Sequence, residues 1–136
     1  MGRVFGWGPA ALWAAVLFLL SELQGGDDGL LGVLPAGADK LVHLGLYLIL
    51  GLLLAWGKTR TGFAGPAILL LIMGAGYGAL DEWHQSFVPG RDASVGDWVA
   101  DSAGVMLGLV LFSIFSSRAQ KNGRPPSEGT ATTDSA

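Results

Sequence analysis

The sequence contains no cysteine and few charged residues. Without cysteine, disulfides and thiolate metal sites are excluded. Charged residues make up 14% of the 136 residues, whereas soluble domains carry about 25%. Together with 51% hydrophobic residues and a mean hydropathy of +0.49, this depletion indicates an integral membrane protein. A net charge of −3, without a basic stripe, argues against a nucleic-acid partner.

Sequence motifs of several enzyme classes are also missing. The chain has no GxSxG nucleophile motif, no GxxxxGK[ST] phosphate loop and no HExxH zinc motif. Its two histidines, His43 and His84, lie far from the i, i+4 spacing of a helical metal site. The sequence therefore predicts no metal and no cofactor, and it leaves open whether the protein is an enzyme.

Four apolar segments cover most of the chain, at residues 5–23, 39–57, from 63 to about 81, and 95–115. About 20 helical residues cross a bilayer core of about 30 Å, so we predict an all-α membrane protein with four transmembrane helices. No small-x-small cleavage site follows the first segment directly, which favours a retained helix over a signal peptide. We expect one transmembrane domain over residues 1–117 and a disordered cytoplasmic tail over residues 118–136, which is rich in Ser, Thr, Pro and charge.

The distribution of basic residues predicts the orientation. Six of them lie at the N-terminus, in the turn after the second segment or in the C-terminal tail, against two in the other loops. The positive-inside rule then places both termini in the cytoplasm. Most acidic residues gather at the opposite, external side of the cell (inner) membrane. The basic residues of the first group are Arg3, Lys58, Arg60, Arg118, Lys121 and Arg124, and the other two are Lys40 and Arg91.

Polar and small residues form one stripe on each of the last three segments, because residues three or four apart share a helix face. Small stripes mark the faces where membrane helices approach each other, so we expect the ionisable groups to point into the bundle. The 22 glycines favour such packing within one chain or between chains, and the oligomeric state stays open. The stripes are Asp39, His43, Tyr47 and Gly51; Gly74, Gly78, Asp81 and Gln85; and Asp97, Asp101, Gly104 and Gly108.

Several of these polar residues have simpler explanations. Asp39 has the residue type of a helix N-cap, and Lys40 can extend to the membrane surface. Ser94 and Asp97 fit a capping box. Asp101 lies about 10 Å along its helix, at 1.5 Å per residue, which is too deep for a cap. Charges at such depth are usually paired or line a polar cavity. We therefore predict an external binding site formed by Asp39, Lys40, His43, Asp81, Glu82, Gln85, Arg91 and Asp101.

Residues of the second segment, of the end of the third segment with the turn after it, and of the fourth segment resemble the VanZ-like family of small bacterial membrane proteins. The resemblance rests on Asp39-Lys40-Leu41-Val42-His43, on the DExxQxFxPGR string from Asp81 to Arg91, and on Asp97 with Gly104-x-x-x-Gly108, within residues 5–115. The family pattern usually has Asn about four residues after Asp97, whereas this chain has Asp101, which adds a negative charge. The resemblance implies a link to low-level resistance to the glycopeptide teicoplanin, without naming a reaction.

Three functions agree with this sequence. The first is a cell-envelope membrane protein that binds the head group of an envelope lipid or glycan in the external site. The second is a membrane enzyme that modifies a lipid-linked envelope substrate, with His43 or Glu82 as general base. The third is a structural four-helix protein in which buried charges only set the helix register.

Overall fold

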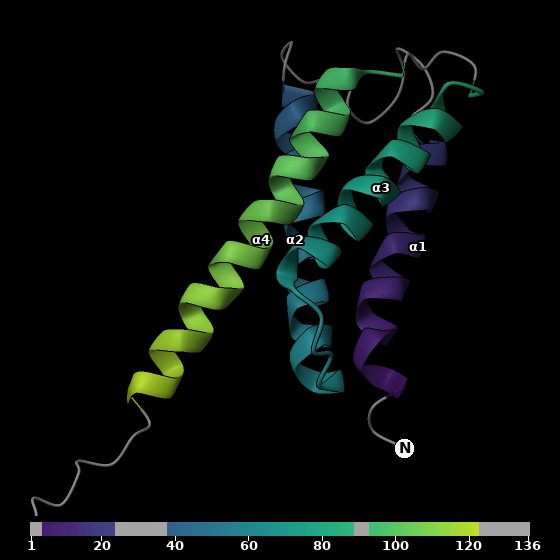
Figure 1. The fold of residues 1–136 in the computed structure, drawn as a ribbon. Coiled ribbons are helices and arrows are strands. Elements are labelled where there is room, and N and C mark those ends of the chain that lie inside the picture. The colour runs from purple at the N-terminus through teal and green to yellow at the C-terminus, as the bar shows by residue number, and fades with distance from the viewer. Residues whose placement is uncertain (1–3, 24–37, 89–92, 123–136) are drawn as a thin grey trace, which may run out of the picture.

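The computed structural model describes residues 4–23, 38–88 and 93–122 of the chain, and these are almost entirely helical. A short 3-10 helix, η1 (Val4–Trp7), leads into α1 (Gly8–Leu23). The helices α2 (Ala38–Thr61), α3 (Ala67–Gln85) and α4 (Val95–Asn122) follow, so the prediction of four helices is confirmed. Figure 1 shows that the start of α1 and the end of α2 lie at one end of the bundle, that α3 begins above the end of α2 and rises to the opposite end, and that α4 diverges from α2 towards its C-terminus.

Three of the four helical segments are long and apolar enough to cross a membrane, namely Phe5–Glu22, Ala38–Thr61 and Val95–Asn122. Large apolar side chains such as Leu12, Leu41 and Ile72 are exposed on the outside of the bundle, where a lipid bilayer covers them favourably. α3 is shorter than α2 and α4, and its last turns carry Asp81, Glu82 and His84. The chain is therefore a membrane protein in which α3 brings ionisable groups to one end.

α2 ends four residues later than the sequence predicted, because its final turn incorporates the basic residues. Lys58 and Arg60 lie in that turn, where positive charge is favourable beside the negative end of the helix dipole. Gly62 follows with φ 69°, and the backbone N–H of Phe63 donates to the carbonyl of Lys58 at 3.1 Å. This is a Schellman motif, which ends a helix at a glycine in the left-handed conformation.

Two other predicted boundaries were wrong. The third helix begins at Ala67 rather than near Phe63, because Pro66 adopts an extended conformation immediately before the helix. The fourth helix continues to Asn122 instead of ending near Phe115, so residues 118–122 of the predicted tail are helical. The remaining tail residues and the predicted Pro89-Gly90 turn lie outside the described residues.

Glycines bring α2 and α4 into close contact. A Cβ added at Gly51 would collide with the backbone of Val105, and a Cβ at Gly104 or Gly108 would collide with the backbone of α2. Gly74 on α3 lies against the Val105 side chain in the same way, with 2.7 Å between its hypothetical Cβ and the valine methyl groups. The predicted small-residue stripes therefore form the helix contacts, as expected when backbones pack closely in membranes.

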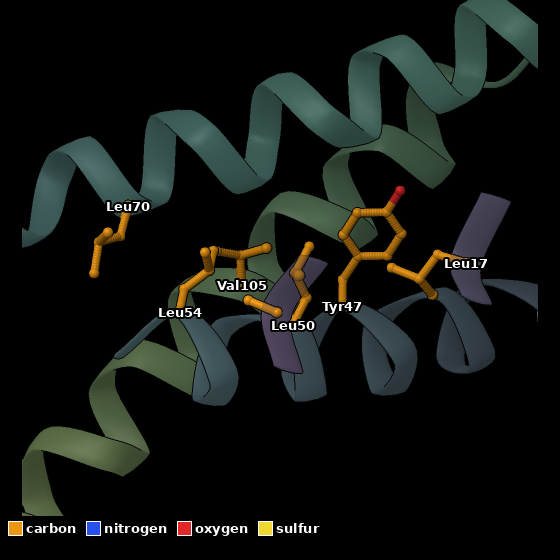
Figure 2. Packing of buried hydrophobic residues seen from close by; sticks show 7 residues of the cluster. Leu17, Tyr47, Leu50, Leu54, Leu70 and Val105 are labelled. Carbon is orange, nitrogen blue, oxygen red and sulfur yellow. The ribbon is translucent and has the colours of Figure 1, made fainter. Parts of the chain in front are cut away.

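The apolar core lies between the helices at mid-height. Figure 2 shows Leu17 of α1, Tyr47, Leu50 and Leu54 of α2, Leu70 of α3 and Val105 of α4 gathered in one cluster. The Tyr47 side chain extends from α2 so that its hydroxyl points towards α3. Tyr47 is 1% exposed, and its hydroxyl marks the level where the apolar core gives way to polar side chains.

Candidate functional site

A cluster of polar side chains is buried beyond Tyr47, at the end of the bundle where α3 ends and α2 and α4 begin. We call it the polar cluster. The exposed fractions of its members lie between 0% and 7%, so water does not screen their charges as it does at a surface. Four of its six members lie on the helix faces predicted from spacing, and the other two, Ser21 and Glu82, do not. The polar cluster consists of Ser21, His43, Asp81, Glu82, Gln85 and Asp101.

The centre of the polar cluster is a contact between α2 and α4. His43 Nδ1 lies 2.9 Å from Asp101 Oδ1, and both residues are buried. Gly78 on α3 provides space for the carboxylate, since a Cβ there would lie 3.1 Å from Asp101 Cβ. A carboxylate bonded to one ring nitrogen fixes the orientation of the imidazole.

Glu82 connects the end of α3 with the start of α4. The backbone N–H of Ser94 donates to Glu82 Oε2 at 2.8 Å. In a capping box the N–H of the capping residue donates to the side chain of the third residue of the same helix, which would be Asp97. Here the Ser94 N–H donates to Glu82 of α3 instead. The other half of the predicted box is present, because the Asp97 N–H approaches Ser94 Oγ at 3.4 Å.

Gln85 links the polar cluster to α1. Its side-chain amide donates to Ser21 Oγ at 2.9 Å and to Asp81 Oδ2 at 3.1 Å. The Tyr47 hydroxyl also approaches Asp81 Oδ2, at 3.5 Å. Sequence analysis missed Ser21. The sequence feature that could have identified it is the helical spacing of three or four residues, which places Ser21 on the same inward face of α1 as Ala10, Ala14 and Leu17.

Asp39 and Lys40 lie at the rim of the polar cluster and not in its centre. Lys40 Nζ is 2.8 Å from Asp97 Oδ1 and 3.4 Å from Asp39 Oδ2. The side chains of Lys40 and Asp39 are 47% and 42% exposed, as expected for surface ion pairs. Arg91, the remaining predicted binding residue, lies outside the described residues.

Two carboxylate oxygens inside the polar cluster meet no hydrogen-bond donor in the described part of the chain. They are Glu82 Oε1 and Asp101 Oδ2, and both are fully buried. Each carboxylate is thus held by one oxygen while its other oxygen stays unbonded. Buried polar atoms are almost always bonded, so these oxygens indicate a ligand, an ion or a proton that completes them.

One ligand atom each from His43, Glu82 and Asp101 lies within 4.8 Å of the others. A small cavity of about 20 Å³ adjoins His43 but is lined by neither Glu82 nor Asp101; its lining also includes Ser21, Asp81 and Gln85. One water molecule needs at least about 10–15 Å³ of such volume, so the cavity has room for about one water.

A larger, apolar groove lies further along the seam of α1, α2 and α3, and it shares no lining residue with the small cavity. Its volume is about 240 Å³. Small side chains on α1 and Gly74 on α3 leave this space open, and Tyr77 bounds it. The Tyr77 hydroxyl donates to the backbone carbonyl of Ala14 and so holds α1 and α3 together beside the groove. The groove residues are Trp7, Ala10, Ala11, Ala14, Leu50, Leu54, Met73, Gly74 and Tyr77.

A family model described as VanZ/LLP1 matches residues 7–116, which include every residue of the polar cluster. No curated protein and no solved structure matches the chain.

Proposed function

The chain belongs to the VanZ/LLP1 family, and we propose that it is a bacterial inner-membrane protein that binds an envelope lipid, with the head group at the polar cluster. The observation that carries this proposal is the pairing of two adjacent spaces along one seam. The polar cavity touches His43, Asp81 and Gln85, and the apolar groove lies below it between the same three helices. A lipid has the same order of polar head and apolar chain, with one polar atom of the head group in the cavity, which holds about one water. A free glycan would leave the groove empty.

The external position of the polar cluster is part of the proposal. It is supported by the basic residues at the other end of the helices, with Lys58 and Arg60 in the last turn of α2 and Lys121 in that of α4. The positive-inside rule assigns such an end to the cytoplasm. A head group at the external end belongs to the leaflet where cell-wall precursors are used. Resistance to teicoplanin-type glycopeptides, to which the family is linked, is then the phenotype to examine.

Substitution in the groove tests this proposal. We expect Ala14→Phe to fill the groove and to lower the lipid retained by the purified protein at least fivefold, measured by native mass spectrometry. Ala15→Phe is the matched control, because Ala15 is the next residue on α1 and is exposed outside the groove. Equal lipid retention in wild type and both variants, or equal loss in both variants, would contradict a lipid in this groove.

A membrane enzyme that acts on the same lipid is the second candidate. It is favoured by the contact between His43 Nδ1 and Asp101 Oδ1 at 2.9 Å, since a histidine oriented by a carboxylate can act as general base. The two candidates differ in one measurement. An enzyme converts the lipids that copurify with it during incubation in detergent, and His43→Gln abolishes that conversion, whereas a binding protein returns them unchanged.

A further inference from the structure

We propose that His43, Glu82 and Asp101 bind one divalent first-row transition-metal ion, of the Mn²⁺ or Zn²⁺ type. The three residues come from α2, α3 and α4, and each offers a ligand atom within 4.8 Å of the other two. Sequence spacing predicted no metal because the ligands lie on three separate helices. The proposal goes beyond lipid binding and does not depend on it.

The geometry is close to that of a coordination shell. Neighbouring ligands of an octahedral ion with bonds of about 2.1 Å lie about 3.0 Å apart, and opposite ligands about 4.2 Å apart. The contact of 2.9 Å between His43 Nδ1 and Asp101 Oδ1 is a hydrogen bond, so it orients the carboxylate and is not itself a distance between two ligand atoms. The three ligand atoms lie within 4.8 Å of one another. This upper limit exceeds the separation of opposite ligands by a few tenths of an ångström, so small side-chain movements would complete the shell.

The unbonded oxygens of Glu82 and Asp101 are the observation that points to a ligand. Glu82 is 7% and Asp101 0% exposed, and Glu82 Oε1 and Asp101 Oδ2 meet no donor among the described residues. The Ser94 N–H holds the other oxygen of Glu82, and His43 holds that of Asp101. The arrangement fixes both carboxylates and leaves one lone-pair-bearing oxygen on each, as metal ligation requires.

Charge favours the same ion. Two buried carboxylates placed close together repel each other, and a divalent cation between them balances their charge without a proton on either. Lys40, the nearest lysine in sequence to His43, is engaged at the rim with Asp39 and Asp97. Two carboxylates with one imidazole suit ions whose ligand preference is intermediate. Such ions bind oxygen ligands less exclusively than Mg²⁺ does, and nitrogen and sulfur ligands less exclusively than the softer metals do. Three protein ligands would leave coordination positions open for water or a substrate oxygen.

Metal binding to the full-length protein in detergent tests the proposal. After removal of metal with a chelator, we expect Mn²⁺ titration followed by electron paramagnetic resonance to give one bound ion per chain. Equimolar Zn²⁺ should displace it, because zinc exceeds manganese in affinity for most sites, while tenfold excess Mg²⁺ should not. Pulsed spectra should show a nitrogen coupling from a bound imidazole.

Matched variants distinguish this site from adventitious binding. We expect His43→Gln, Glu82→Gln and Asp101→Asn each to weaken Mn²⁺ binding at least tenfold. His84→Gln and Glu22→Gln are the controls, since this second histidine–glutamate pair lies at the edge of the bundle, and both should bind as the wild type does. The nitrogen coupling should disappear only in His43→Gln.

Two results would overturn the proposal. One is a wild-type protein that binds no Mn²⁺ or Zn²⁺ stoichiometrically, which needs no variant and would leave protonation of a carboxylate as the explanation of the unbonded oxygens. The other is a loss of binding in the His84 or Glu22 control as large as that in the triad variants. Gel filtration of each variant shows whether it is folded. If a variant is not folded, the proposal is judged from the metal stoichiometry and the nitrogen coupling of the wild-type protein.

Discussion

The molecule contains two histidine–carboxylate pairs that differ mainly in their surroundings. His43 of α2 pairs with Asp101 of α4, and their side chains are 9% and 0% exposed. His84 of α3 pairs with Glu22 of α1, and their side chains are 36% and 45% exposed. Both pairs join helices that are distant in sequence. Their comparison separates what the pair contributes from what the environment contributes.

The environments differ because of the helix contacts that create them. α2 and α4 approach through glycine, which brings their backbones close together, and the side chains of His43 and Asp101 are buried between the helices. At the other pair, the ring of Phe18 lies over His84 with 4.9 Å between the ring centroids, and the outer side is open. Exposed ion pairs contribute about 0–1 kcal/mol, whereas loss of one partner from a buried pair costs about 3–5 kcal/mol. Chemically similar pairs should therefore respond very differently to mutation.

Removal of each histidine gives the largest expected difference. In metal-free detergent we expect His43→Ala to lower the free energy of unfolding by about 3–5 kcal/mol, because Asp101 is left buried and unpaired. His84→Ala should cost less than about 1 kcal/mol. Denaturant-induced unfolding followed by circular dichroism measures both. The variant that combines His43→Ala with Asp101→Asn should recover part of the loss, and equal losses in the two single variants would show that burial does not separate the pairs.

Glycine substitutions on α2 test the helix contact that buries the first pair. Gly51→Ala should cost about 1–3 kcal/mol, because the new methyl group meets the backbone of Val105 and α4 must move away. Gly45→Ala on the same helix has open space around it and should be neutral or stabilising by up to about 1 kcal/mol, from helix propensity. The same unfolding assay measures both. If the two variants are equally stable, α2 and α4 do not pack through this glycine.

Two serines at the polar end provide the smallest contrast. Ser21→Ala removes a buried acceptor of Gln85, and we expect a loss of about 1 kcal/mol. Ser86→Ala removes an exposed hydroxyl that bonds only the carbonyl of Trp83 among the described residues, and it should stay within about 0.5 kcal/mol of wild type. A thermal unfolding series in one detergent resolves this difference. Equal effects would mean that Ser21 is not enclosed with Gln85.

Much of the fold could be predicted, because the length of an apolar segment indicates a membrane helix and the spacing of its small and polar residues indicates which face is buried. The stripe from His43 to Gly51 and its counterparts on α3 and α4 predicted which faces are buried, and the structure confirms this for His43, Gly78 and Asp101. Boundaries were harder to predict, since they depend on local backbone geometry. The positive φ of Gly62 and the extended Pro66 decide where α2 ends and α3 begins.

The arrangement within the polar cluster could be predicted only in part. Spacing indicates which face of a helix is polar, but not which helix that face meets or at what height. The contact between His43 and Asp101 spans 58 residues of sequence and depends on the register between α2 and α4. The contribution of Ser21 depends in the same way on how α1 packs against α3, where Ser21 accepts from Gln85. Sequence could therefore name most members of the polar cluster but not their partners.

The bond between Glu82 and the backbone of Ser94 also bears on how this protein can vary in evolution. The bond joins two residues 12 positions apart, and it uses a backbone N–H that every residue except proline provides. The ends of α3 and α4 are therefore tied together at the base of the connection between them. Closing a somewhat longer loop adds little entropic cost, about 0.6 kcal/mol for each doubling of length. A longer connection would thus leave Glu82 in its position beside His43 and Asp101.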